Sequence, residues 1–231
     1  KLSEIKNSIA PTILSLTSEQ EDAVAEIINY KDSFNGFLLH GVTGSGKTEV
    51  YLRVTEKLLE EGKQVLVLVP EIGLTPQMID RFGKRVNGRV VAVHSQLNET
   101  QKQDAYLMAK SGEAKVVLGT RSAIFTSLPN LGLIIVDEEH DGSFKQQSNF
   151  RYSARDLSFI RAKLANIPLI LGTATPSLET LKNVADKKLT KLVLNNRPGN
   201  AIMPDVNLID MRSQPVEALS NPLVAKIKHY L

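Results

Sequence analysis

The segment Gly41-Val42-Thr43-Gly44-Ser45-Gly46-Lys47-Thr48 separates a short apolar run, Phe37 to His40, from an amphipathic stretch, Glu49 to Glu61. The apolar run predicts a buried strand, and the amphipathic stretch predicts a helix that ends at Gly62. The segment fits the pattern G-x-x-x-x-G-K-[ST], whose glycines let backbone N–H groups turn inward around phosphate oxygens at a helix N-terminus. Its position between a strand and a helix is the one that a phosphate-binding loop requires.

Each residue type in this loop has a chemical reason. Lys47 is expected to reach the β- and γ-phosphates of ATP, and Thr48 is expected to be a ligand of Mg²⁺. The alternative is a glycine-rich turn that matches by chance, which should happen on the order of one time in a hundred in a chain of this length. We therefore interpret the segment as a P-loop whose other nucleotide-binding residues are Gly41, Thr43, Gly44, Ser45 and Gly46.

Further apolar runs alternate with helix-like stretches through most of the chain. They are apolar throughout rather than alternating, as burial on both faces of a parallel sheet requires. Right-handed βαβ crossovers then give a single P-loop NTPase lobe, a parallel sheet with helices on both faces. The remaining predicted strands are Val65 to Val69, Val90 to His94, Val116 to Gly119, Leu133 to Asp137 and Leu169 to Gly172.

The length of the chain and the positions of its proline- and glycine-rich segments predict the domain organisation. A chain of 231 residues that is 42% apolar can bury one sizeable core. We expect an N-terminal arm at 1–15, an ATP-binding lobe at 16–196, and a connector with the truncated start of a second lobe at 197–231. The connector is rich in proline and glycine and contains a strand candidate, Val206 to Asp210, before a helix that opens near Asn221-Pro222. The chain does not begin with Met, and both ends look cut from a longer protein.

Charge and composition exclude several classes. Lysine and arginine exceed aspartate and glutamate by only 28 to 25, so any nucleic-acid contact is expected to be local. The absence of cysteine excludes disulfides and thiolate zinc sites within these residues. No apolar run approaches the ~20 residues that span a bilayer, and the first residues do not resemble a signal peptide. A cytoplasmic protein without a membrane partner is the expectation.

The predicted strand that ends at Asp137 is followed by Glu138-Glu139-His140. A carboxylate at the C-terminal end of a parallel strand can hold phosphate-bound Mg²⁺, so Asp137 is expected to be a metal ligand. Glu138 is expected to orient or deprotonate the attacking water, and the predicted catalytic residues are Glu138, Asp137 and Lys47. Taken singly, Glu139 is interpreted as solvated and His140 as a structural histidine.

Two hydroxyls, Thr173 and Thr175, follow the next predicted strand and precede Pro176. In isolation they are typical of a helix N-cap, because a helix-like segment opens at Pro176 and Ser177. A functional role for them depends on their neighbours in space.

Taken together, the P-loop, the string Asp137-Glu138-Glu139-His140 and the turn Thr173-Ala174-Thr175 resemble the motifs of superfamily-two helicases. The strings at 41–51, 69–75, 119–123 and 137–141 are similar to those of the replication-restart helicases of this superfamily, in unbroken order over about residues 16 to 212. The resemblance implies a recombinase-type lobe, one of two that clamp ATP. It implies a DNA-dependent ATPase that translocates 3′ to 5′ and unwinds stalled forks.

The resemblance also implies partners and further parts. Forked and single-stranded DNA, the primosome and single-strand-binding proteins would be partners of the parent protein. A second lobe that donates an arginine to the γ-phosphate, an N-terminal DNA-end-binding domain and a Cys-rich zinc module would lie outside this sequence. Zinc is therefore expected only in the absent part of the parent.

Single residues receive roles from the same motifs. Strings 69–75 and 119–123 match motifs that contact the DNA backbone, with Thr75, Thr120 and Arg121 as candidates for phosphate contacts. Without the resemblance, Arg121 would be an ordinary solvated charge. Gln20 is expected to bind the adenine, while Thr17-x-x-Gln20 is also a helix capping box. The residues expected to couple ATP hydrolysis to movement are His140, Thr173 and Thr175.

Aromatic and cationic residues are interleaved between Asp141 and Asp156. Aromatic faces stack on unpaired bases while nearby cations follow the phosphates, and the segment is similar to the aromatic-rich loop of this helicase group. We expect it to sense single-stranded DNA, with Phe144, Lys145 and Arg151 as contacts. The alternative is that Phe144 and Phe150 anchor the loop onto the core.

Two other functions remain open from the sequence. A nucleotide-dependent DNA-binding switch would hydrolyse ATP without unwinding DNA. An RNA helicase lobe would share the P-loop and the acidic motif, but forked DNA would not stimulate its ATPase.

Overall fold

The computed structural model describes residues 15–196 and 221–230. The chain divides into two compact units, Lys1–Pro198 and Gly199–Leu231. The predicted N-terminal arm, apart from residue 15, and the strand candidate Val206 to Asp210 lie outside the described residues. In the second unit, the predicted C-terminal helix is present as α7, Asn221–Tyr230.

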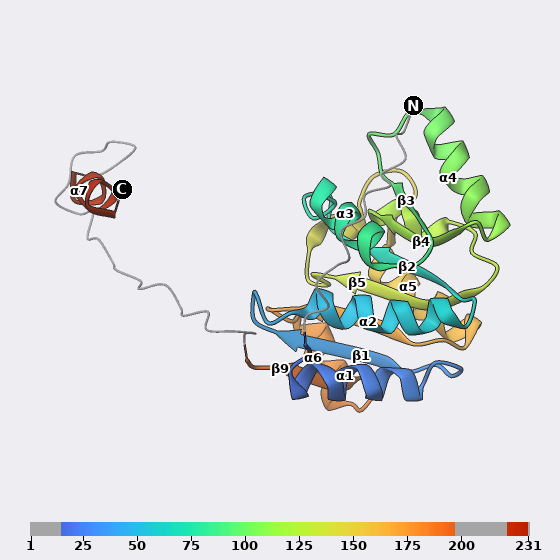
Figure 1. Cartoon of the computed structure of the whole chain (residues 1–231), viewed down its shortest axis with the longest axis horizontal. Helices are drawn as coiled ribbons and strands as arrows, with labels where there is room; N and C mark the ends of the chain where they lie inside the picture. Colours follow the sequence, from blue (N-terminus) through green and yellow to red (C-terminus); the bar gives the residue numbers. More distant parts are fainter. Residues whose placement is uncertain (1–14, 197–220, 231) are drawn as a thin grey trace. The chain divides into compact units, whose positions relative to one another are not determined.

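The first unit is built on a seven-stranded sheet in the order β3-β4-β2-β5-β8-β1-β9 (Figure 1). Every pairing in this sheet is parallel, which confirms the predicted α/β lobe. The strands are β1 Gly36–Gly41, β2 Gln64–Leu68, β3 Arg89–Val93, β4 Ala114–Gly119, β5 Leu131–Asp137, β8 Leu169–Thr173 and β9 Thr190–Leu194. Two further residue pairs, β6 Lys145–Gln146 and β7 Tyr152–Ser153, form a small antiparallel hairpin.

The six predicted strands are confirmed to within two residues at each end, whereas β9 was not predicted. This strand lies at the edge of the sheet, and exposed positions alternate with less exposed ones along it. The apolar runs of the five inner strands come from burial on both faces. In β9 the apolar run is limited to Leu192 to Leu194 and follows two polar residues, so the signal is weaker than in the other edge strand, β3.

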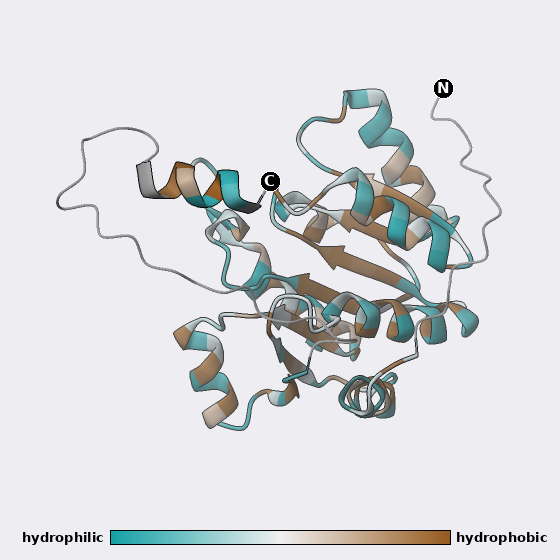
Figure 2. Ribbon diagram, turned by 60° about the vertical axis from the view of Figure 1, so that its left-hand side comes forward, coloured by the Kyte–Doolittle hydropathy of each residue, from teal (hydrophilic) through white to brown (hydrophobic). Residues whose placement is uncertain are grey.

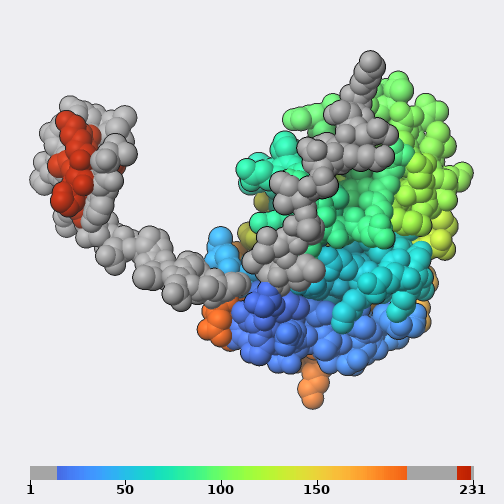
Figure 3. All heavy atoms as spheres, in the orientation of Figure 1, coloured from blue at the N-terminus to red at the C-terminus, as the bar shows by residue number. Residues whose placement is uncertain are grey.

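Helices cover both faces of the sheet, as predicted. They are α1 Ser18–Asn29, α2 Lys47–Glu60, α3 Pro76–Arg85, α4 Glu99–Ser111, α5 Ala154–Ala165 and α6 Leu178–Ala185, with short 3₁₀ turns η1 Arg121–Phe125 and η2 Gly142–Phe144. Figure 2 shows largely hydrophobic strands between helices of mixed colour. In Figure 3, α2 is packed between α1 and the green segment that contains α3.

Two hydrophobic clusters form the core, one on each face of the sheet. Val65 and Val67 of β2 pack into the cluster with α1, α2 and α3, while Leu66 and Leu68 pack into the cluster with α4 and α5. This alternation follows from the two-residue repeat of a strand. The sheet is therefore held rigidly from both sides, and the loops at the carboxyl ends of its strands are mounted on a fixed base.

Helix starts follow the local sequence. Thr17 and Asn98 each form a capping box with the residue three positions later, and Thr75 accepts a hydrogen bond from Met78 N with Pro76 next to it. None of the described helices combines the length and apolar character needed to cross a bilayer.

Candidate nucleotide-binding site

The P-loop connects the end of β1 to the start of α2. Gly44 and Gly46 both have a φ of 83°, a left-handed backbone that glycine adopts without steric cost. Gly46 occupies the N-cap position of α2, where no side chain caps the helix. No side chain therefore accepts hydrogen bonds from the first N–H groups of α2, and these groups can donate to a bound anion. The helix dipole also favours negative charge at this end.

Two side chains of this loop fit a phosphate ligand. The ammonium of Lys47 is buried and donates to the carbonyl oxygen of Gly41 at 2.8 Å. The Ser45 hydroxyl is buried and has no hydrogen-bond partner among the described residues. A buried polar group without a partner is costly, and phosphate oxygens would satisfy both the hydroxyl and the ammonium.

The acidic motif lies beside this loop at the end of β5. Tyr51, one turn into α2, donates from its hydroxyl to Asp137 Oδ1 at 2.9 Å. Burial raises the pKa of Asp137, while the Tyr51 hydrogen bond and the charge of Lys47 oppose that rise. Tyr51 is completely buried and passes over Gly172 of β8, where a Cβ atom would overlap its hydroxyl. The amphipathic pattern of the stretch Glu49 to Glu61 does not reveal this polar contact.

The donor set suits Mg²⁺ bound together with a phosphate. No group of three or more histidine, aspartate or glutamate side chains within residues 15–196 and 221–230 could hold a metal. Mg²⁺ is typically bound by one or two protein ligands plus substrate phosphates, and Thr48 and Asp137 can provide those ligands.

The three residues predicted to couple the motifs meet in space. His140 Nδ1 lies 2.8 Å from the Thr173 hydroxyl, and the Thr175 hydroxyl lies 3.4 Å from both ring nitrogens. Neither threonine caps α6, whose N-cap is Ser177, so the N-cap interpretation is wrong. Glu138 adopts a left-handed φ of 48°, and one of its oxygens lies 3.7 Å from His140 Nδ1. Backbone strain of this kind clusters at functional sites.

Glu139 was interpreted as solvated, and the structure corrects this. The residue is 1% exposed, and its carboxylate accepts hydrogen bonds from Ser177 N at 2.8 Å and from the Thr180 hydroxyl at 2.9 Å. The Ser177 hydroxyl at 3.1 Å and the Arg155 guanidinium at 3.2 Å also donate to it. A buried carboxylate needs such partners. Glu139 therefore joins the end of β5 to the first turns of α5 and α6.

Gln20 has the local role predicted for it. Its side-chain oxygen accepts from Thr17 N at 2.9 Å, and its backbone N–H donates to the Thr17 hydroxyl at 3.3 Å. Its amide nitrogen also donates to the carbonyl of Ser45 at 2.9 Å, which ties α1 to the P-loop. The contact with adenine stays a prediction.

Some of the predicted DNA contacts are exposed, whereas others are buried or already make hydrogen bonds within the protein. Lys145 and Arg151 are exposed, and the Thr75 hydroxyl, although exposed, is engaged at the start of α3. Thr120 is almost buried. Arg121 is not a freely solvated charge, because its guanidinium donates to the carbonyls of Ser143 at 3.0 Å and Lys145 at 3.2 Å.

Phe144 does not face solvent, and its expected role as a DNA contact is corrected. It is 1% exposed and packs into the core cluster beneath η1 and α5. Its ring is an anchor of the loop, whereas Phe150 in the same loop is 72% exposed. The two phenylalanines therefore differ in environment, which the sequence alone does not distinguish.

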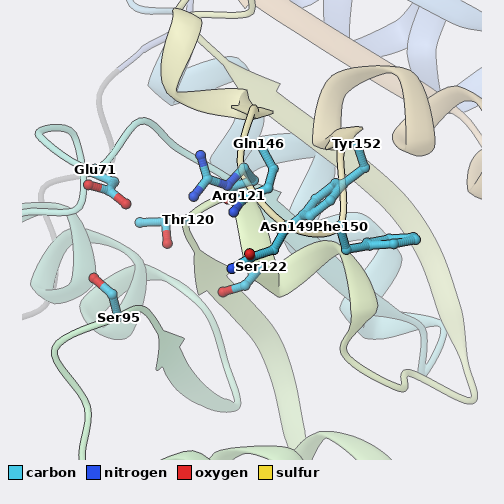
Figure 4. Close-up of a pocket in the computed structure, with 9 residues that line it drawn as sticks. All are labelled: Glu71, Ser95, Thr120, Arg121, Ser122, Gln146, Asn149, Phe150 and Tyr152. Carbon is cyan, nitrogen blue, oxygen red and sulfur yellow. The ribbon is translucent and has the colours of Figure 1, made fainter.

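A cavity of about 310 Å³ lies between η1 and the aromatic loop (Figure 4). Thr120, Arg121 and Ser122 contribute from the η1 segment, and Gln146, Asn149, Phe150 and Tyr152 contribute from the loop. Glu71 and Ser95 complete its wall. The cavity contains no P-loop residue, so it is separate from the nucleotide-binding site.

A family model described as DEAD/DEAH box helicase matches residues 17–184. The chain is 48% identical to replication restart protein PriA of Haemophilus influenzae over 219 residues, which cover 94% of this chain and 30% of that protein. It is 45% identical to PriA of Bacillus subtilis over 203 residues, or 87% of this chain and 25% of that protein. The chain thus spans about a quarter to a third of the length of these curated relatives.

A solved structure supports the fold. The structure of RecG bound to a three-way DNA junction superposes with a TM-score of 0.60 at 24% identity, covering 81% of this chain and 25% of that one. The predicted resemblance to replication-restart helicases is confirmed by the relatives above. With a helicase family model matching most of the described lobe, the chain belongs to the DEAD/DEAH box helicase family.

Proposed function

We propose that this lobe binds Mg-ATP and is a motor lobe of a DNA-dependent ATPase and 3′-to-5′ DNA helicase that acts in replication restart. The observation that carries the proposal is the hydrogen bond between Tyr51 of the P-loop helix and Asp137 of the acidic strand end. Through it, the phosphate-binding loop and the predicted metal ligand are held side by side. Identity of 48% with a replication restart protein supports the biological role.

Each residue of the site has a step to perform. Lys47 would exchange its hydrogen bond with Gly41 O for phosphate oxygens, and the free N–H groups at the start of α2 would bind the same anion. Thr48 and Asp137 would hold Mg²⁺, which when bound with ATP neutralises charge on the reacting phosphates. Glu138 would orient a water molecule and accept its proton at a carboxylate oxygen.

Coupling to DNA would run through the turn at Thr173. His140 contacts Thr173 directly and lies two residues after Glu138, so a shift of Glu138 is transmitted to the segment before α6. Forked and single-stranded DNA are the proposed substrates, and the primosome and single-strand-binding proteins are the proposed partners. Work at replication forks would place the protein in the bacterial cytoplasm.

The test separates binding, hydrolysis and unwinding in the full-length protein. Glu138→Gln should keep ATP binding and lose turnover, because the amide keeps the shape but cannot accept the proton. Lys47→Ala should instead weaken ATP binding by ~1.5–3 kcal/mol, the range for a charged hydrogen bond. Titration calorimetry and a phosphate-release assay distinguish the two variants. An ATPase rate near wild type in Glu138→Gln would show that a residue other than Glu138 is the general base.

A strand-displacement assay decides between the proposed function and its alternatives. The wild-type protein should displace a strand from forked DNA and require ATP to do so. Hydrolysis without displacement would favour a nucleotide-dependent switch. Stimulation of the ATPase by RNA but not by forked DNA would favour an RNA helicase.

A further inference from the structure

An ion pair joins the phosphate-binding helix α2 to its neighbour α3. Arg85, the last residue of α3, donates from Nη1 and Nη2 to the two carboxylate oxygens of Glu49 at 3.1 and 3.0 Å. Its Nε donates to Glu56, further along α2, at 3.1 Å. Both carboxylates belong to α2, so one guanidinium holds the end of α3 at two points of the neighbouring helix.

The pair is shielded from water. The Arg85 side chain is 8% exposed and the Glu49 side chain is 13% exposed. Lys84, the residue before Arg85, instead pairs with Asp80 inside α3, and these side chains are 52% and 40% exposed. A surface pair of the second kind contributes little, whereas a bidentate arginine–carboxylate pair fixes the orientation of its partners as well as their distance. A movement of Glu49 is therefore transmitted to Arg85.

Helix dipoles do not account for this contact. A carboxylate in the first turn of α2 and a cation in the last turn of α3 each complement a helix dipole. Two residues that never touch would meet that requirement equally well. The engagement of three N–H groups of Arg85 on α2 is a separate feature, and it makes the two helices move together.

The pair connects two predicted ligand sites. Glu49 directly follows Thr48, the predicted Mg²⁺ ligand of the P-loop. At its other end, α3 starts after Thr75, which is predicted to contact a DNA phosphate, and the first turn of α3 contains no acidic residue. A helix of ten residues is about 15 Å long. Through Arg85, α3 therefore links the start of α2 to the segment 69–75.

Apart from Arg85, α3 has a small set of anchors. Among its ten residues, Phe82 alone is buried, and Met78 and Ile79 are partly buried against the same hydrophobic cluster. A short helix that packs on one apolar side can slide on the core as a rigid body. The contact with Arg85 then decides whether α3 follows a displacement of α2.

We propose that Arg85 is a positioning residue that couples the nucleotide-binding site to the segment 69–75. A displacement of the first turn of α2 on binding of Mg-ATP passes through Glu49 and Arg85 to α3, which carries Thr75 with it. The inference rests on the proposed function, because it takes Mg-ATP and DNA as the ligands of the lobe. This route is separate from the one through His140 and Thr173.

The test measures how strongly each ligand changes the affinity for the other. Full-length protein is titrated with fluorescent oligothymidylate of about 16 nucleotides, with and without saturating Mg²⁺ and a non-hydrolysable ATP analogue. The ratio of the two dissociation constants is the coupling factor, and in the wild type we expect a change of about 5- to 150-fold. By reciprocity, titration of the analogue with and without DNA must give the same factor.

The decisive variant replaces both partners, Arg85→Met together with Glu49→Gln. Removal of one partner would leave a shielded charge without compensation, whereas neutral residues of similar shape at both positions are tolerated far better. The double variant should still bind each ligand. Its coupling factor should fall to about 1, the value at which neither ligand affects the other.

Two control variants should keep the wild-type factor. Lys84→Ala removes the neighbouring ion pair, which lies entirely within α3. Glu56→Gln removes the other carboxylate that Arg85 contacts, but it leaves the bidentate pair next to Thr48 in place. Melting temperatures of all variants report stability separately from coupling.

Each contrary result has a distinct meaning. A lower melting temperature in the double variant with a wild-type coupling factor would make the pair an ordinary structural contact and overturn the inference. A wild-type factor of about 1, or equal losses in the double variant and in either control, would overturn it as well. Wild-type protein that binds neither the ATP analogue nor the oligonucleotide would instead contradict the proposed function itself.

Discussion

Asp137 illustrates how single residues build the nucleotide-binding site. Its carboxylate is partly buried, which raises its pKa, and the hydroxyl of Tyr51 donates to it at 2.9 Å. Gly172 leaves the space through which Tyr51 reaches it. The hydroxyl holds one carboxylate oxygen in place beside the start of the P-loop helix. Tyr51 is in this sense a positioning residue for the metal ligand.

Tyr51→Phe should therefore weaken the contribution of Mg²⁺ to ATP binding and leave metal-free binding unchanged. A hydrogen bond to a charged group contributes ~1.5–3 kcal/mol, which sets the upper limit of the effect. ATP affinity is measured in Mg²⁺ and in EDTA for wild type, Tyr51→Phe and the control Tyr106→Phe, an exposed tyrosine of α4. The positioning role is ruled out when the ratio of the two affinities is the same in all three proteins.

At the level of elements, the loop between β5 and α5 combines two kinds of residue. Phe144 fills the core beneath η1, and Phe150 stands in solvent. Truncation of a buried phenylalanine to alanine costs ~3–5 kcal/mol, because the transfer free energy is lost and a cavity remains. Exposed substitutions away from such features usually stay within about 0.5 kcal/mol.

Phe144→Ala should accordingly lower the free energy of unfolding by ~3–5 kcal/mol, and Phe150→Ala by less than about 0.5 kcal/mol. Urea denaturation monitored by circular dichroism measures both values under identical conditions. A Phe144→Ala variant as stable as Phe150→Ala would mean that the ring leaves the core in solution. In that case the original expectation of a DNA contact at Phe144 would return.

The elements that could be predicted from the sequence are those whose residues carry the signal locally. Continuous apolar runs identify the buried strands. The glycine-rich pattern of Gly41 to Thr48 identifies the phosphate-binding loop, in which Gly44 and Gly46 adopt a φ above zero. The edge strand β9 has only the short apolar run Leu192 to Leu194, along which exposed and less exposed residues alternate. Glu139 finds its partners Ser177 and Thr180 about forty residues away, a pairing that no local pattern contains.

In the candidate site, too, the residues that could be predicted are those whose local sequence indicates their position. His140, Thr173 and Thr175 could be grouped because each follows a predicted strand, and the carboxyl ends of parallel strands share one edge of the sheet. Phe144 and Phe150 could not be separated, since residue type does not tell which ring the core accepts. The contact between the rings of Phe125 and Tyr152 could not be predicted either, because the two residues are 27 positions apart and only the fold brings them together.

For the whole molecule, the groups around the phosphate-binding loop come from α1, α2, β1 and β5 of one lobe. The hydrolysis transition state spreads negative charge over the γ-phosphoryl oxygens on all sides. In related nucleotide hydrolases, an arginine supplied from across the cleft is worth ~10³–10⁵ in rate. Lys47 and Mg²⁺ neutralise charge from one side only, and a site open to water weakens every electrostatic contact made there.

The chain of residues 1–231 on its own should therefore bind ATP weakly and hydrolyse it negligibly, with or without single-stranded DNA. A phosphate-release assay on the purified chain tests this, with Glu138→Gln as the background control. Because a self-associated active site would form only at higher protein concentration, the rate per molecule is measured over a dilution series. Robust DNA-stimulated turnover that does not change on dilution would contradict the prediction, since a single lobe would then stabilise the transition state without a group from across the cleft.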